Sequence, residues 1–138
     1  MPTINGVLET ALYVEDLERS VEFYRRLFGF ETLLETPGRL HAMNVAGRQV
    51  LLLFRIGASQ GSNPVPGGVV PAHDGRGRLH VAFAISGEEV EGWRKRLSDV
   101  GVEVESTVVS PGGGMSLYFR DPDGHLIELA TPGLWGAI

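Results

Sequence analysis

The hydrophobic positions of the chain divide it into two halves with the same order of patterns. The first half begins with a strand-like run over 7–14, followed by apolar residues at i, i+4, i+7 and i+11. That spacing places them on one face of a helix, with Asp16 as the N-cap and Gly29 just beyond the C-terminus. The apolar face of this predicted helix consists of Leu17, Val21, Tyr24 and Phe28.

The second half repeats this order. A strand-like run over 79–85 precedes a second amphipathic pattern at i, i+3, i+7 and i+10. Ser86 and Glu89 fit a capping box, and Gly101 stands where a helix commonly ends. The apolar face of this second predicted helix consists of Val90, Trp93, Leu97 and Val100.

Three strand-like stretches follow each predicted helix. In the first half they cover 30–35, 40–45 and 49–55; in the second half they cover 102–109, 115–120 and 126–130. Each half therefore has the order β-α-β-β-β, and Glu9 and Gly29 have counterparts at His80 and Gly101, 71 and 72 positions later. The pattern predicts an α+β fold built from two tandem βαβββ modules, and indicates an internal duplication.

A glycine- and proline-rich segment separates the halves. Residues 57–78 hold six glycines and three prolines, which predicts a long loop. Loops of this length in a compact domain are uncommon and are often functional, so we expect this one to contact a cleft or a partner subunit. We therefore expect a single domain over 1–138, with modules of about 5–56 and 79–132 joined by this loop.

Composition and charge exclude several classes of function. The chain has no cysteine, which rules out a disulfide framework, a thiolate metal site and a cysteine nucleophile. Its 12 basic and 17 acidic residues give a net charge of −5, a poor match for nucleic acid or an anionic membrane. The N-terminus lacks the features of a signal peptide, and the longest apolar run, 50–54, is too short to span a bilayer. A cytoplasmic protein is the expectation.

Three ionisable residues stand on strand faces that otherwise carry small side chains. Because side chains alternate along a strand, Glu9 shares a face with Ala11, His80 with Ala82, and Glu128 with Ala130. The bulky residues point to the opposite faces, which suit packing against the helices. If the strands bring the small-residue faces together, Glu9, His80 and Glu128 converge in a concavity.

These residues and the motifs around them resemble a known family, the vicinal oxygen chelate superfamily. It is also called the glyoxalase, bleomycin-resistance and dioxygenase superfamily. The resemblance covers nearly the whole chain, and its final motif is quite specific. The matching stretches are Leu12 to Leu17, Leu27 to Phe30, His80 to Ala84, Tyr118 to His125, and Glu128 with Leu129. It implies two βαβββ modules that form a curled mixed sheet around a cleft.

The resemblance also implies one divalent metal ion held at three positions. His80 matches the family's histidine and Glu128 its last-strand carboxylate, whereas Glu9 stands where many members have histidine or glutamine. Mn, Fe, Ni and Zn all suit such oxygen and nitrogen ligands. The strand over 49–54 lacks the fourth ligand of lactoylglutathione lyases, which leaves open positions for water or substrate.

The implied function is metal-dependent catalysis on a small oxygen-rich substrate that chelates the metal through two oxygens. Lyase or isomerase chemistry, or transferase chemistry, is favoured over dioxygenase chemistry, with Glu9 or Glu128 as the group that moves a proton. Ser116 and Tyr118 are candidate substrate-binding residues, or else ordinary strand hydroxyls. Fosfomycin modification is disfavoured, because the tail after the last strand lacks the family's cationic residue. The family favours a homodimer.

Other interpretations stay open. Glu9, His80 and Glu128 can instead form a metal-free buried polar cluster, in which the histidine is an ion-pair partner. The chain can then be a binding protein of the bleomycin-resistance kind, or a regulatory or structural dimer with a residual site. Outside this set, we expect His125 and His41 to be surface or packing residues and Trp135 to pack the C-terminal tail on the body or on a partner subunit.

Overall fold

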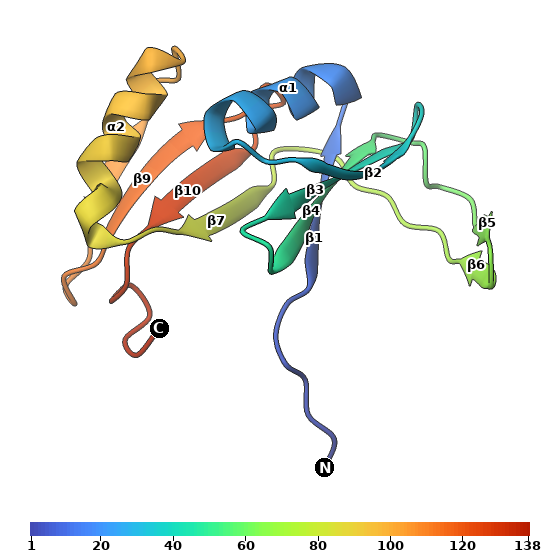
Figure 1. Cartoon of the computed structure of the whole chain (residues 1–138), viewed down its shortest axis with the longest axis horizontal. Helices are drawn as coiled ribbons and strands as arrows, with labels where there is room; N and C mark the ends of the chain where they lie inside the picture. The colour runs from blue at the N-terminus through green and yellow to red at the C-terminus, as the bar shows by residue number, and fades with distance from the viewer. The chain divides into compact units, whose positions relative to one another are not determined.

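The computed structural model describes all residues, 1–138, and divides into two compact units, Met1–Arg76 and Gly77–Ile138 (Figure 1). Each unit holds one of the two expected modules and has its own sheet. Neither of the two α-helices is long and apolar enough to cross a membrane.

The first unit is a βαβββ module with a mixed four-stranded sheet. Its elements are β1 (Glu9–Val14), α1 (Leu17–Phe28), β2 (Thr32–Thr36), β3 (Leu40–Val45) and β4 (Gln49–Arg55). The sheet order is β1-β4-β3-β2; β1 and β4 are parallel and the other neighbours antiparallel. The Asp16 side chain accepts a hydrogen bond from the Arg19 amide, and Gly29 ends the helix at φ 73°, as the sequence predicted.

The second unit repeats this topology. Its elements are β7 (His80–Ala84), the 3₁₀ turn η1 (Gly87–Glu89), α2 (Val90–Asp99), β8 (Ser106–Val109), β9 (Met115–Arg120) and β10 (Leu126–Ala130). The order β7-β10-β9-β8, with β7 parallel to β10, matches that of the first sheet strand for strand. The shared order confirms the predicted α+β fold of two βαβββ modules.

The bulky face of each sheet forms the core of its unit. In the first unit Leu12, Tyr24, Met43 and Leu53 are at most 1% exposed; in the second, Phe119 and Leu129 are fully buried. In the second sheet, alternation leaves the other face to small and polar residues, as the sequence predicted; in the first sheet, Ala11 shares that face with Leu52 and Phe54 of β4. That face carries Glu9 in the first unit and His80 and Glu128 in the second.

Four strands, β1, β2, β7 and β8, begin later than the sequence pattern suggests. For β2 and β8 the reason is that the residues before them serve the helices. Phe30 stacks on Phe28 with ring centroids 4.9 Å apart, so β2 begins only at Thr32. The Val102 amide donates to the Leu97 carbonyl, a Schellman bond that closes α2, and β8 begins only at Ser106. The capping-box prediction at Ser86 was wrong: its side chain makes no capping bond, and a 3₁₀ turn precedes α2.

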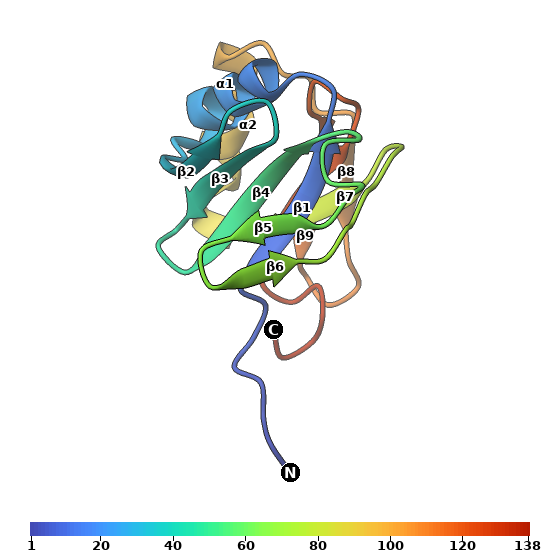
Figure 2. The same cartoon turned by 90° about the vertical axis from the view of Figure 1, so that its right-hand side faces the viewer.

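The segment 57–78 is not a structureless loop. It contains a short hairpin of β5 (Asn63–Val65) and β6 (Gly68–Val70), which stands off from the sheet of the first unit in Figure 1 and lies in front of that sheet in Figure 2. The turn residues Pro66 and Gly67 connect two very short strands, and the sequence pattern was too short to reveal them.

The Asp74 carboxylate links the two ends of this segment through hydrogen bonds. Its carboxylate accepts hydrogen bonds from the Gln60 side chain at 2.9 Å and from the amides of Gly75 and Gly57 at 2.9 and 3.3 Å. The Gln60 bond, followed by the Gly75 bond, lowers the pKa of Asp74 from its ordinary value of 3.8. The ionised carboxylate therefore holds the segment in its observed path.

Protonation of the Asp74 carboxylate should break these hydrogen bonds. A lowered pKa means that the bonds are complete above the ordinary value and are lost as the pH falls through the folded-state value. The amide NMR shifts of Gly57 and Gly75 should therefore titrate together with a midpoint below 3.8. This titration should vanish in Asp74→Ala and persist in Asp99→Ala, which removes an exposed carboxylate elsewhere. A midpoint at or above 3.8 would contradict the linking of the segment's ends by the ionised Asp74 carboxylate.

Candidate metal and substrate site

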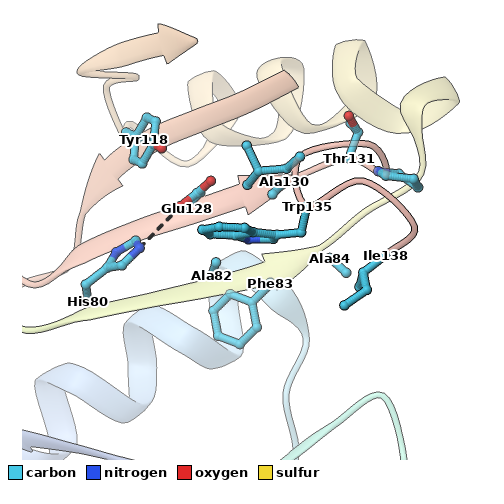
Figure 3. Close-up of a pocket in the computed structure, with 12 residues that line it drawn as sticks. His80, Ala82, Phe83, Ala84, Tyr118, Glu128, Ala130, Thr131, Trp135 and Ile138 are labelled. Atoms are coloured by element: carbon cyan, nitrogen blue, oxygen red, sulfur yellow. Dashed lines mark ion pairs between the residues drawn. The ribbon is translucent and has the colours of Figure 1, made fainter. Parts of the chain in front are cut away.

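A pocket of about 590 Å³ opens on the small-residue face of the second unit's sheet (Figure 3). β7 contributes His80 and Ala82, β9 contributes Tyr118, and β10 contributes Glu128 and Ala130. The C-terminal tail supplies the remaining wall, with Leu134, Trp135 and Ile138. The ionisable side chains of the pocket, His80, Glu128 and Tyr118, thus lie at one end, and the rest of the lining is apolar apart from Thr131.

His80 and Glu128 meet at that polar end. The His80 Nε2 atom lies 3.2 Å from Oε1 of Glu128, the contact marked by the dashed line in Figure 3. The His80 side chain is 49% exposed, whereas that of Glu128 is 6% exposed. Ser116 donates a 2.6 Å hydrogen bond from Oγ to Oε2 of Glu128. One carboxylate oxygen is therefore anchored, and the other faces the imidazole.

A backbone hydrogen bond sets the orientation of the imidazole. Nδ1 of His80 lies 2.8 Å from the carbonyl oxygen of Leu126, which can only accept, so Nδ1 carries the proton and donates. Nε2 is then the atom that faces Glu128. Its lone pair and a carboxylate oxygen can sit 3.2 Å apart only with a proton or a cation between them.

This pair fits two adjacent ligands of one divalent ion. Two ligand atoms bonded to one ion at about 2.1 Å lie about 3.0 Å apart at a right angle and about 3.4 Å apart in a tetrahedron. The 3.2 Å separation falls between these values. A histidine whose other nitrogen donates to a backbone carbonyl is also the usual arrangement of a metal-bound histidine. The donor set and its geometry therefore suit a metal.

The third predicted ligand lies in the other unit. Glu9 is the first residue of β1, as His80 is of β7, and its side chain is exposed on the small-residue face of the first sheet. Within each unit, no three His, Asp or Glu side chains gather closely enough to hold an ion. The structure thus brings His80 and Glu128 together, and the participation of Glu9 stays a prediction.

Comparisons with known proteins agree with the fold. A family model described as Glyoxalase/Bleomycin resistance protein/Dioxygenase superfamily matches residues 6–129. The chain belongs to this superfamily. The resemblance stated from the sequence motifs is therefore confirmed.

Individual relatives of the superfamily match nearly the whole chain. The Metallothiol transferase FosB of Bacillus licheniformis is 30% identical over 93% of this chain and 76% of its own length. The Fosfomycin resistance protein FosX of Listeria monocytogenes is 27% identical over 91% of this chain and 89% of its own. The crystal structure of a lactoylglutathione lyase from Agrobacterium tumefaciens aligns with a TM-score of 0.88 and 35% identity, covering 98% and 99% of the two chains.

The two candidate substrate-binding residues of this superfamily member differ in accessibility. Tyr118 lines the pocket, and its ring centroid lies 6.5 Å from that of His80. Ser116 is 1% exposed, with its hydroxyl bonded to Glu128. The observed contact of Ser116 is therefore with the candidate ligand, and a contact of either residue with substrate stays a prediction.

His125 is a packing residue, one of the two outcomes expected from the sequence, and it orients the start of β7. It is 1% exposed, and its Nδ1 accepts the amide of Leu79 at 2.8 Å, one residue before His80. Asp121 in turn accepts the amide of His125 at 2.9 Å. The turn over 121–125 thus connects the β9–β10 corner to His80, a contact that no spacing in the sequence revealed.

The C-terminal tail folds back on its own unit, but Trp135, which was expected to pack the tail on the body or on a partner subunit, is 77% exposed in the single chain. Figure 3 shows the Trp135 indole reaching across the pocket towards His80 and Glu128. The tail approaches the backbone of 112–114 closely: a Cβ atom on Gly114 would lie 2.7 Å from the Leu134 nitrogen. Glycine at 114 is therefore what lets the tail reach the pocket.

We expect Gly114→Ala to displace the tail, because its Cβ would meet backbone atoms that cannot move aside without shifting the chain. In this variant the backbone amide NMR signal of Leu134 should move towards its position in an unfolded chain. Gly61→Ala is the matched control, since a Cβ there meets nothing within 4 Å. An unchanged Leu134 amide signal in Gly114→Ala would contradict the packing described.

Proposed function

We propose that this protein is a divalent-metal-dependent enzyme that acts on a small oxygen-rich substrate bound through two of its oxygens. The observation that carries the proposal is the His80–Glu128 pair, with Nε2 and Oε1 3.2 Å apart at the polar end of an otherwise apolar pocket. Glu9 is the third proposed ligand, and the ion is Mn, Fe, Ni or Zn.

When bound, the metal would polarise a substrate oxygen and stabilise negative charge developing there. The protein's own groups orient the metal ligands and contact the substrate. Leu126 fixes the His80 ring through Nδ1, and Ser116 holds Glu128 through Oε2. Tyr118 lies beside the pair and can donate its phenolic hydrogen to a substrate oxygen.

Of the two candidate proton-transfer groups, Glu9 is the one less constrained by hydrogen bonds and burial. Both oxygens of Glu128 are engaged, one by Ser116 and one by His80, and its side chain is nearly buried. The exposed Glu9 carboxylate makes no such bonds in the structure. A carboxylate that must accept and release a proton needs room to move, so we assign this step to Glu9, which would have to leave the metal in part to perform it.

The pocket walls favour a substrate with an apolar part over a compact multiply charged one. Apart from His80, no basic side chain lines the pocket, and Leu134, Trp135 and Ile138 form its far wall. We therefore favour lyase, isomerase or transferase chemistry on such a substrate, and we do not favour fosfomycin. A homodimer in the cytoplasm is part of this proposal, by analogy with the superfamily.

The same apolar wall supports a second candidate, a small-molecule binding protein of the bleomycin-resistance kind. In that case the His80–Glu128 pair is an ion pair with a proton between its atoms, and the pocket holds its ligand without chemistry. Metal binding separates the two functions, since only the enzyme requires it.

Calorimetric titration of Mn²⁺ and Zn²⁺ into metal-free protein tests the proposal. We expect one site per chain in the wild type, weakened in Glu9→Gln, which removes the charge while keeping the shape. Glu9→His should retain binding and favour Zn²⁺, because imidazole is a softer ligand than carboxylate. Glu18→Gln, an exposed carboxylate on α1, is the control. Uptake by Glu9→His but not by the wild type would mean that Glu9 is not a working ligand and would favour the binding-protein function.

A further inference from the structure

The segment that leads into β1 contains an asparagine followed directly by a glycine, Asn5–Gly6. Residues 1–8 are all exposed and belong to no helix or strand, and Figure 1 shows them leading away from the sheet of the first unit. Neither Asn5 nor Gly6 makes a hydrogen bond in the structure. The side-chain amide of Asn5 and the backbone N–H of Gly6 are therefore both open to reaction.

A reaction between these two groups needs no partner except water, and asparagine is one of the thermolabile residues of proteins. The backbone nitrogen of Gly6 attacks Cγ of Asn5 and closes a succinimide ring, in which the new bond to Cγ replaces the bond to the side-chain nitrogen. The side-chain nitrogen leaves as ammonia and takes up the proton that the Gly6 nitrogen loses. Water then opens the ring on either side, and the product is aspartate or isoaspartate.

Glycine at position 6 makes this attack feasible. The attacking nitrogen must approach the side chain of the preceding residue, and a Cβ on its own Cα would crowd that approach and restrict backbone rotation. Gly6 has a φ of 144°, a conformation that other residues rarely adopt. A Cβ atom built at Gly6 would meet nothing within 4 Å, so no packing holds the residue in an unreactive conformation.

The other asparagines of the chain each lack a requirement of the reaction. The side-chain oxygen of Asn44 accepts a backbone amide at 2.7 Å in the β3–β4 turn, and the next residue is the β-branched Val45. Asn63 precedes Pro64, whose nitrogen has no proton to lose. Exposure, a free N–H and a following glycine thus coincide at Asn5 alone.

Two aspartate–glycine pairs can form the same ring with loss of water, but the folded structure occupies the attacking nitrogen of each. The Gly75 amide donates to the carboxylate of Asp74 at 2.9 Å. The Gly124 amide, which follows Asp123, donates to the carbonyl of Asp121 at 3.0 Å. An N–H held in a hydrogen-bonded turn reacts only when the turn opens. Folding therefore protects these two pairs.

We propose that Asn5–Gly6 is a self-modification site, at which Asn5 converts to aspartate and isoaspartate in the folded protein while the other asparagines stay intact. Each conversion adds one negative charge to a chain whose net charge is already −5. The isoaspartyl form also directs the backbone through the side chain of residue 5 and lengthens the segment that leads into β1. The proposal involves no metal and does not depend on the proposed function.

Peptide mass spectrometry of the folded full chain, incubated in neutral and in mildly alkaline buffer, tests the proposal. We expect the acid forms to accumulate at Asn5, with the isoaspartyl peptide resolved from the aspartyl peptide by chromatography. The conversion should be faster in the alkaline buffer, because the attacking nitrogen must lose its proton. Gly6→Ala should slow it at least about tenfold. Gly61→Ala, at a position that is likewise exposed and open, should leave the rate unchanged.

The same measurement in denaturant tests whether the fold selects the site. Asp74 and Asp123 should form isoaspartate in the unfolded chain and not in the folded one. Equal rates at these two positions in folded and unfolded protein would overturn the selection by the fold. No conversion at Asn5 in the folded chain would overturn the proposal, as would equal rates in wild type and Gly6→Ala, or faster conversion at either of the other asparagines.

Discussion

Replacing His80 by alanine should abolish metal binding. His80 supplies the nitrogen donor of the pair, and its Nδ1 bond to Leu126 already holds Nε2 in the orientation that a ligand needs. Without it, the proposed site has only carboxylate ligands, and the nitrogen–oxygen pair that the structure brings together is lost. We expect no measurable heat on titration with Mn²⁺ or Zn²⁺.

The Tm of this variant should fall, because the buried Glu128 carboxylate loses the partner of its Oε1 atom. His41→Ala is the matched control, since His41 lies on β3 of the other unit and bonds to Thr32. Metal binding by His80→Ala with wild-type affinity would remove the imidazole from the site and with it the proposed enzyme.

Replacing Glu128 by glutamine should lower metal affinity and raise the thermal stability of the metal-free protein. The carboxylate is 4% exposed, and burying a charge is costly unless its partners fully compensate. Glutamine keeps the shape and can still accept the Ser116 hydrogen bond, but it is a neutral and weaker metal ligand. We expect metal affinity to fall at least a hundredfold while the Tm of the metal-free protein rises by about 2–4 °C, equivalent to about 1 kcal/mol.

Calorimetry and thermal unfolding of the same metal-free samples check both halves of this expectation. Ser116→Ala is the companion variant: it removes the anchor and leaves the charge, so it should lower both Tm and metal affinity. A Tm loss of several degrees in Glu128→Gln would show instead that the carboxylate is part of a stabilising ion pair with His80. The metal-free polar cluster would then be the better description.

Much of the fold was predictable because its signals are local. Asp16 and Gly29 bound α1 where their chemistry predicts, and the strands over 40–45, 49–55, 115–120 and 126–130 have the expected limits. The repeated pattern then predicted the topology. The errors arose where a residue had two competing partners, as with the Val102 amide, which closes α2 in place of extending β8.

The site residues were predictable only where strand alternation determines which face of the sheet a side chain occupies. Alternation placed His80 and Glu128 on one face, and parallel pairing of β7 with β10 brought them to 3.2 Å. The anchoring by Ser116, the support from His125 and the docking of the tail depend on tertiary contacts between segments far apart in the chain. Glu9 lies on the expected face of its sheet, and its part in the site rests on the proposal.

The most direct test of the metal site is a crystal of protein loaded with Zn²⁺ or Mn²⁺, measured by anomalous diffraction at the metal's absorption edge. We expect one anomalous peak per chain, in contact with Nε2 of His80, Oε1 of Glu128 and a carboxylate oxygen of a Glu9 side chain. A peak on His80 and Glu128 that no Glu9 reaches would reject the three-ligand site. No peak at His80 and Glu128, from crystals grown with excess metal, would contradict the proposed metal-dependent function.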